Sequence, residues 1–130
     1  MFYLFPDISQ LMKPREIVIV GASEKENSLA KTTYENIVNR SNFDKNKVHL
    51  VNPRYSEMFG KRCYKKVSDI GSSDIDVAII LIKADYVPDV VRECADSGIG
   101  YALIMTAGFA EVGGKGIELQ AQLEKVINET

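Results

Sequence analysis

The sequence predicts an α/β fold in which a mostly parallel sheet of four to five strands carries helices on both faces. Four apolar segments alternate with stretches of helical periodicity, and this alternation is typical of parallel βαβ units. The third segment, residues 77–82, is an unbroken apolar run rich in β-branched residues, which indicates a strand buried on both faces. The first segment, Ile17-Val18-Ile19-Val20, leads straight into Gly21, where a strand of this class turns into its helix.

The individual elements follow from the periodicity and from the residues that interrupt it. In the second helix, Asp85 is the expected N-cap and Gly98 the residue that ends it. Residues 52–71 are expected to be irregular, with short helical turns near 55–59 and 67–70. Strands are predicted at 16–20, 47–51, 77–82 and 101–105, and helices at 28–40, 85–97 and 114–128.

The order of these elements predicts how the strands lie in the sheet. The first strand takes the centre, the second lies on one side of it, and the third and fourth lie on the other. The direction of winding therefore reverses at the first and third strands, and such sheets bind ligands there, beyond the carboxyl ends of the strands. Four segments are expected at this place: 21–29, 52–55, 82–87 and 106–109.

Length and composition restrict the classes of protein that this chain can represent. Its 130 residues, 45% of them hydrophobic, are expected to form a single domain, 1–130, on which residues 1–12 pack as an N-terminal extension. The net charge of −2 argues against a nucleic-acid partner, and no apolar run is long enough to span a membrane. Cys63 and Cys94 are far apart and have no histidine partner nearby, so neither a disulfide nor a metal site is expected. We expect a cytoplasmic protein.

The first candidate binding segment lies between the first strand and the first helix. Its backbone N–H groups and the Ser23 hydroxyl can meet a pyrophosphate at the amino end of the helix. Asn27 is expected to adopt the left-handed conformation that glycine usually takes. Only the first glycine of the dinucleotide-binding fingerprint is present, so a plain turn with Ser23 and Glu26 as a capping box is the alternative. The candidate residues here are Gly21, Ala22, Ser23, Asn27, Ser28 and Leu29.

The second candidate segment, Asn52-Pro53-Arg54, ends the second strand and predicts the chemistry of the ligand. Proline holds Asn52 extended, and Arg54 stands beside the cleft as a bidentate partner for phosphate. An NAD-binding domain would carry an acidic residue here to hold the ribose hydroxyls. A cation favours a ribose that carries its own phosphate, so coenzyme A (CoA) or NADP is expected ahead of NAD. A solvated arginine in an ordinary turn is the alternative.

Two further segments complete the predicted rim. Ile82-Lys83-Ala84 ends the third strand, and Lys83 is either a phosphate partner or a surface lysine. Thr106-Ala107-Gly108 ends the fourth strand, where small residues let a ligand approach the backbone. His49 lies inside the second strand with no acid, serine or cysteine at a spacing that supports catalysis, so a packed or edge histidine is expected. No residue is predicted to be catalytic.

In order and spacing, these segments resemble the N-terminal CoA-binding domain of the NDP-forming acyl-CoA synthetases, which are related to the α subunit of succinyl-CoA synthetase. The resemblance covers about residues 13–128. The matching pieces are Val18-Ile19-Val20-Gly21-Ala22-Ser23, Val51-Asn52-Pro53-Arg54, Phe59-Gly60, Asp76-Val77-Ala78 and Thr106-Ala107-Gly108-Phe109-Ala110-Glu111-Val112-Gly113.

The resemblance implies a Rossmann-like domain that binds CoA or acyl-CoA. It implies that Ser23 meets the phosphates, that Arg54 meets the 3′-phosphate region, and that residues 82–84 and 106–108 line the adenine and pantetheine path. The full enzymes interconvert acyl-CoA, NDP and phosphate with free acid, CoA and NTP through a phosphohistidine of a later domain. The resemblance therefore implies that this chain binds CoA and does not catalyse alone.

The chain departs from the family pattern at Ala30, where glycine is usual, and at Lys83, which replaces a common proline. It also stops before the family's later domains, so it is expected to be the front part of a longer enzyme whose catalytic domains or subunit are missing here. An NADP-binding oxidoreductase or redox-sensing fragment stays open, as does a stand-alone CoA-binding or interaction module. The open sheet edge at the fourth strand predicts self-association or pairing with a missing subunit.

Overall fold

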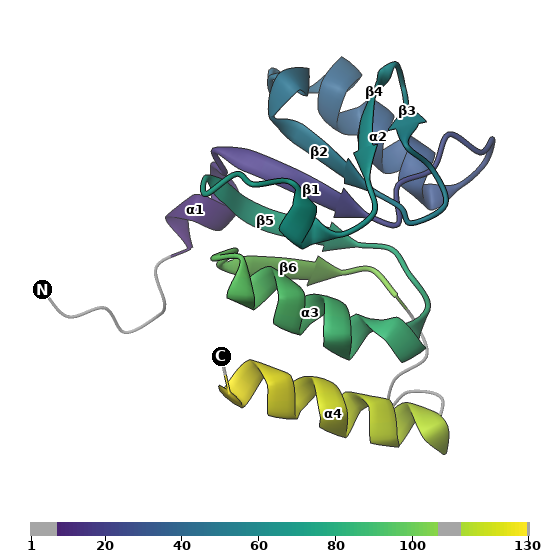
Figure 1. The fold of residues 1–130 in the computed structure, drawn as a ribbon, viewed down its shortest axis with the longest axis vertical. Helices are drawn as coiled ribbons and strands as arrows, with labels where there is room; N and C mark the ends of the chain where they lie inside the picture. Colours follow the sequence, from purple (N-terminus) through teal and green to yellow (C-terminus); the bar gives the residue numbers. More distant parts are fainter. Residues whose placement is uncertain (1–7, 107–112, 130) are drawn as a thin grey trace, which may run out of the picture.

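A computed structural model describes residues 8–106 and 113–129. Its six strands form one sheet in the order β3-β4-β2-β1-β5-β6 (Figure 1). Three 3-10 turns, Lys45–Lys47, Val67–Asp69 and Ala84–Tyr86, lie in the connections. The helices and strands are α1 (Ser9–Met12), β1 (Glu16–Val20), α2 (Leu29–Arg40), β2 (Val48–Val51), β3 (Glu57–Met58), β4 (Lys61–Tyr64), β5 (Ile75–Ile80), α3 (Val87–Asp96), β6 (Tyr101–Ile104) and α4 (Lys115–Glu129).

The strands β4, β2, β1, β5 and β6 run parallel, and all five end level with one another. Val20 at the end of β1 pairs with Val51 of β2 and with Ile80 of β5. Val51 pairs in turn with Tyr64, the last residue of β4, and Ile80 pairs with Ile104, the last residue of β6. The predicted order of the four strands is therefore confirmed, and β1 and β5 meet where the winding reverses.

Successive side chains along each strand point to opposite faces of the sheet, so the sheet packs against a layer of helices on each face. Ile17 and Ile19 face α1 and α2, where Leu11 and Tyr34 join the apolar clusters. Val18 faces the opposite layer, whose cluster contains residues of α3 and α4. All six residues of β5 are buried, which confirms the strand buried on both faces. None of the described helices is long and apolar enough to cross a membrane.

The hairpin of β3 and β4 was not predicted, and the helical turn expected near residues 55–59 is wrong. Phe59 and Gly60 have φ of 53° and 69°, the left-handed pair that a type I′ hairpin turn requires. The Phe59 ring stacks on Tyr34 of α2 with centroids 4.0 Å apart. This stacking holds the hairpin against the helix, and β4 pairs with β2 in the sheet.

The helix ends show which of the predicted caps form. The Ser28 hydroxyl accepts a hydrogen bond from the Lys31 N–H and caps α2, so the capping box of Ser23 and Glu26 does not form. Asp85 was the expected N-cap of the helix that the structure shows as α3. This helix begins at Val87, after a 3-10 turn that contains Asp85, and Asp85 does not cap it. Gly98 follows α3 with φ of 84°, as predicted.

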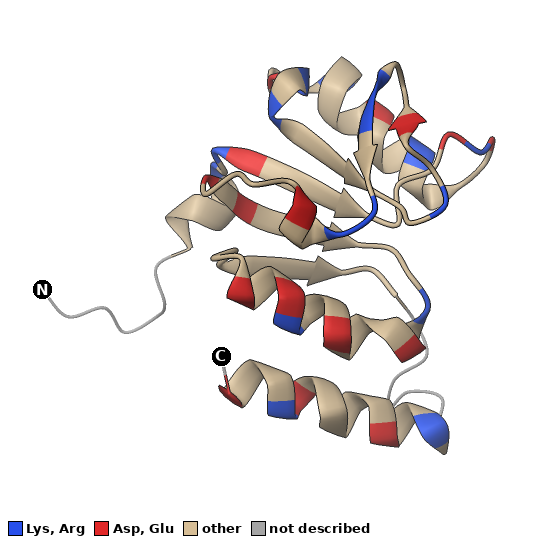
Figure 2. Cartoon of the chain, viewed as in Figure 1, with Lys and Arg blue, Asp and Glu red and all other residues tan. Residues whose placement is uncertain are grey.

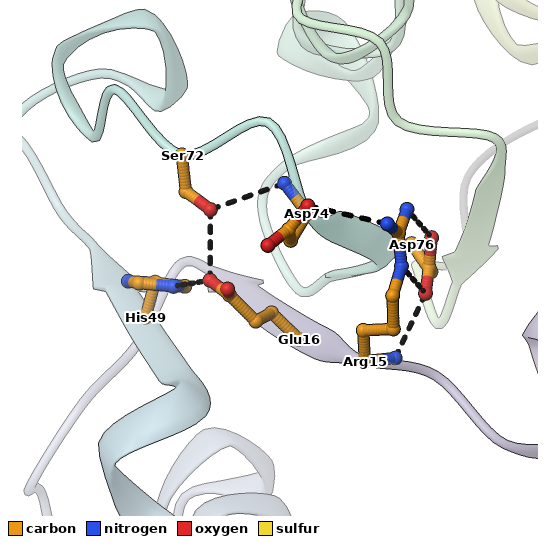
Figure 3. A network of polar contacts seen from close by, with 6 residues as sticks. All are labelled: Arg15, Glu16, His49, Ser72, Asp74 and Asp76. Atoms are coloured by element: carbon orange, nitrogen blue, oxygen red, sulfur yellow. Dashed lines mark hydrogen bonds and ion pairs between the residues drawn. The ribbon is translucent and has the colours of Figure 1, made fainter.

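The amino ends of the strands are held by a polar network, shown in Figure 3. The Arg15 guanidinium donates two hydrogen bonds to the buried Asp76 carboxylate, at 2.8 and 3.1 Å, and one to Asp74 at 3.2 Å. Glu16 accepts a hydrogen bond from Ser72 at 2.8 Å and contacts His49 Nε2 at 2.5 Å. This network fastens β1 to β2 and β5, at the edge of the sheet opposite the predicted ligand site.

We predict that Asp76→Asn lowers the free energy of unfolding by about 1–3 kcal/mol near pH 7, because the charge-assisted hydrogen bonds to Arg15 weaken. Hydrogen bonds from Arg15 lower the pKa of Asp76 against the opposing effect of burial. The carboxylate therefore contributes its full stability above the unfolded pKa, about 3.9, and loses it as pH falls through the lower folded value.

Urea unfolding of the wild type and Asp76→Asn between about pH 2 and 7 measures this effect, with the wild type losing more stability toward acid. Asp74→Asn is the matched control, because the Asp74 side chain is 55% exposed and accepts a single bond from Arg15. Equal acid sensitivity of the wild type and Asp76→Asn would contradict the prediction.

Candidate functional site

A cavity of about 330 Å³ opens at the carboxyl ends of β1, β5 and β6. This volume lies within the range of about 300–1,000 Å³ that is usual for ligand pockets. It lies at the reversal of the winding, where ligands of such sheets bind. Its lining contains six predicted site residues together with Ala30, Leu81 and Met105; the six are Gly21, Ser23, Ser28, Leu29, Ile82 and Thr106.

Gly21 lets two strand ends approach closely enough to shape this cavity. Its φ is 91°, and a Cβ placed on it would lie 2.5 Å from the carbonyl oxygen of Leu81. The N–H groups of Gly21 and Ala22 both donate to the Val51 carbonyl, at 2.9 and 3.2 Å. Within the described residues, these two N–H groups are therefore engaged by the end of β2, and Ala22 itself is buried.

The loop from Ser23 to Leu29 forms the wall of the cavity at the amino end of α2. The Ser23 hydroxyl accepts a hydrogen bond from the Lys25 N–H at 3.0 Å, so its own O–H can still donate. Asn27 is exposed and has φ of 64°, which confirms the predicted left-handed position. The first N–H groups of a helix have no intrahelical partners. The Ser28 N–H donates to the Lys25 carbonyl at 3.1 Å, so the N–H donors beside the cavity come from Leu29 and Ala30, the first two residues of α2.

Asn52 joins the ends of two strands and fixes the loop that carries Arg54. Its side-chain amide donates to the Ala22 carbonyl at 2.9 Å, and its side-chain oxygen accepts from the Arg54 N–H at 3.0 Å. Pro53 and Arg54 are exposed. Within the described residues, the Arg54 guanidinium has no hydrogen bond or ion pair. Asn52 is thus a positioning residue, and Arg54 is a cation available to an anionic ligand.

The segments after β5 and β6 are tied to each other across the cavity. The Thr106 hydroxyl donates to the Ile82 carbonyl at 2.8 Å. Lys83 is exposed, and Ala84 begins a 3-10 turn and packs against the core. Ala107 and Gly108, also predicted as site residues, lie outside the described residues.

Two other hollows flank the site. One, of about 350 Å³, shares Ser23 with the first and is also lined by Lys25 and Tyr55. The other, of about 860 Å³, lies between α2 and the β3–β4 hairpin and contains no predicted site residue. Its lining carries Glu24, Glu26 and Glu35 together with Lys31, Lys45 and Lys61, so the formal charges around this hollow balance. The cavity at the strand ends is the candidate site because it lies at the reversal of the winding and contains predicted site residues.

The side chains that could support other chemistry are buried or belong to the core. Cys63 and Cys94 are free thiols in separate apolar clusters. Burial raises the pKa of both thiols, that of Cys94 to about 12, so both stay protonated near neutral pH. His49 is packed against Glu16. No group of three metal-binding side chains occurs within residues 8–106 and 113–129.

Three residues of the cavity were not among the predicted site residues. Leu81 and Met105 directly follow β5 and β6, and Ala30 is the second residue of α2. Leu81 lines the cavity where the Gly21 backbone approaches its carbonyl. The sequence signal that finds Leu81 and Met105 is their place immediately after a strand, since parallel strands end at one edge of the sheet, whereas Ala30 lies within the first turn of the helix.

We predict that Gly21→Ala lowers the free energy of unfolding by about 2–5 kcal/mol, from the left-handed backbone and the overlap with Leu81. Gly100→Ala is the control, since a Cβ there has no atom within 4 Å. Thermal and urea unfolding of both variants give the comparison. Similar stability of the two variants would show that the contact between Gly21 and Leu81 does not constrain the fold.

Comparisons with known proteins agree with this geometry. The family model described as "CoA binding domain" matches residues 15–129. The chain is 38% identical over 120 residues to an acetate–CoA ligase (ADP-forming) of Methanocaldococcus jannaschii, covering 92% of this chain and 16% of that protein. It is 33% identical to the α subunit of acetate–CoA ligase (ADP-forming) II of Pyrococcus furiosus, covering 92% of this chain and 25% of that subunit.

A solved structure shows the same fold. The dinucleotide-forming acetyl-coenzyme A synthetase 1 of Ca. Korarchaeum cryptofilum, in its apo form, superposes with a TM-score of 0.83 at 33% identity. The match covers 95% of this chain and 26% of that one. The chain thus spans about a quarter or less of these relatives, and it belongs to the CoA-binding domain family.

Proposed function

We propose that this chain binds CoA across the carboxyl ends of its parallel strands. The observation that carries the proposal is the cavity at the reversal of the winding, where residues from three strand ends meet the amino end of α2. A helix amino end with free N–H groups attracts phosphate. Membership of the CoA-binding domain family gives the ligand class.

The charges along this edge suggest how CoA lies on it. The pyrophosphate is placed at Ser23 and the first turn of α2, where hydroxyl and N–H donors face the cavity. The 3′-phosphate is placed at Arg54, whose guanidinium can bind it bidentately. The adenine and pantetheine path then follows Ile82, Lys83 and Thr106.

We further propose that the chain supplies the CoA-binding part of an ADP-forming acyl-CoA synthetase. Its relatives carry that activity in their names, and each is much longer than the matched region. No catalytic residue is assigned to this chain, so phosphoryl and acyl transfer would rest with other domains or a further subunit. Self-association through the edge strand β6, where the Leu103 side chain is 43% exposed, remains a prediction.

Calorimetric titration with CoA, dephospho-CoA, NADP and NAD tests the ligand. We predict that CoA binds more tightly than the other three, because only CoA pairs a pyrophosphate with a 3′-phosphate at the required places. Arg54→Ala should weaken CoA binding about tenfold, since a charge-assisted hydrogen bond contributes about 1.5–3 kcal/mol and tenfold corresponds to about 1.4 kcal/mol. Dephospho-CoA, which lacks that phosphate, should bind the variant and the wild type equally.

Arg40→Ala is the control for general loss of positive charge, because Arg40 is an exposed arginine at the carboxyl end of α2. It should leave all four affinities unchanged. Tighter binding of NADP than of CoA would favour an oxidoreductase fragment, and absence of binding to any of the four would overturn the proposal. Equal losses of CoA and dephospho-CoA in Arg54→Ala would remove Arg54 from the 3′-phosphate.

A further inference from the structure

The strand β4, which sequence reasoning missed, ends beside the loop that carries Arg54. Tyr64, its last residue, pairs with Val51 of β2, and the next residues of the chain are Lys65 and Lys66. Asn52 N–H donates to the Tyr64 carbonyl at 2.9 Å. The two lysines therefore leave the sheet at the same edge as Asn52-Pro53-Arg54 and directly next to it.

The loop after β2 also folds back over β4. The Cys63 N–H donates to the Ser56 carbonyl at 2.9 Å, so residues on both sides of Arg54 are held against this strand, Asn52 by Tyr64 and Ser56 by Cys63. Arg54 is consequently bracketed by two backbone contacts to β4. The backbone of the loop that carries Arg54 and the backbone of Lys65 and Lys66 therefore start from neighbouring points at the end of β4.

The charge on Lys65 and Lys66 is available to a ligand. Both residues are exposed, and within residues 8–106 and 113–129 neither ammonium group has a hydrogen bond or an ion pair. Two other lysines, by contrast, are engaged: Lys31 pairs with Glu26, and Lys115 pairs with Asp85 at 3.0 Å. The chain directly after β4 is blue in Figure 2, at the edge where the strand arrows point.

We propose that Lys65 and Lys66 act with Arg54 as a cationic wall that selects a ligand with a phosphate monoester on its ribose, the 3′-phosphate of CoA. The proposal rests on the proposed CoA site. Adjacent strands lie about 4.8 Å apart, so β4 lies about 10 Å from β1 with β2 between them. After Lys66 the chain turns toward α3, where Val67 joins the cluster that contains Val20 and Ile80 and the Ser68 N–H donates to Glu93, so the two lysines lie between the end of β4 and this turn.

The phosphates of CoA differ in the charge that they present to these cations. A phosphate monoester carries a charge of about −1.5 to −2 near pH 7, more than either diester-like phosphate of the pyrophosphate. Lysine binds phosphate as a point charge without strict geometry. Two lysines therefore strengthen the attraction for the monoester, while Arg54 supplies the oriented contact. Removing them should affect CoA and leave dephospho-CoA nearly untouched.

The test compares the 130-residue wild type with the double variant Lys65→Gln/Lys66→Gln by calorimetric titration with CoA and dephospho-CoA. The ratio of the two dissociation constants measures selection of the 3′-phosphate. We expect this preference for CoA to fall roughly three- to tenfold in the double variant, as expected for the loss of exposed charge pairs. Thermal unfolding confirms that both proteins are folded, and substitution of exposed lysines should not alter it.

The double variant Lys13→Gln/Lys47→Gln is the matched control. It removes the same amount of charge, but these exposed lysines lie near the amino ends of β1 and β2. It should keep the full preference for CoA. The inference is overturned if the double variant Lys65→Gln/Lys66→Gln keeps the preference, or if its affinities for both ligands fall equally. In either case the proposed function stands as long as the wild type binds CoA. If the wild type does not bind CoA, the proposed function fails, and the inference fails with it.

Discussion

Parallel pairing that ends five strands at one level is the constraint on which the rest of this structure depends. Hydrogen bonding between β1 and its two neighbours sets the register, so that Val20, Val51 and Ile80 stand side by side. Every connection that follows must then leave from the same edge of the sheet. Gly21 is the tightest of these connections, because its backbone approaches Leu81 where a side chain does not fit. The cavity exists because the strands end together and because the chain turns there at a residue without a side chain.

Charged side chains are paired differently at the amino ends and at the carboxyl ends of the strands. At the amino ends, Arg15 is paired with Asp76, and Glu16 is paired with His49 and Ser72. Hydrogen bonds from His49 and Ser72 lower the pKa of Glu16 against the opposing effect of burial. At the carboxyl ends, Lys31 and Lys115 are paired with carboxylates, whereas Arg54, Lys65, Lys66 and Lys83 are exposed and have no ion pair within the described residues. Satisfied charges fasten strands together, whereas the unsatisfied ones along the opposite edge are suited to an anionic ligand.

Much of this arrangement could be predicted from the sequence, because the strongest signals are long and regular. The alternation of strands and helices predicted the strand order, the apolar run of β5 predicted its burial on both faces, and Asn27 was correctly expected to be left-handed. The β3–β4 hairpin was missed because strands of two and four residues carry little periodicity. Its turn at Phe59 depends on stacking against Tyr34, a residue 25 positions away in the sequence that no local pattern reveals. The lysines after β4 were missed for the same reason.

The central claim is that CoA lies on the carboxyl edge of the sheet, and amide chemical shifts of the 15N-labelled chain during titration with CoA test it most directly. The account predicts that the largest shifts occur at Ser23, Leu29, Arg54 and Thr106, with little change at His49 on the opposite edge. Shifts concentrated around Tyr34 and Asn39, which line the hollow of about 860 Å³ beside α2, would contradict the account and move the ligand to that surface.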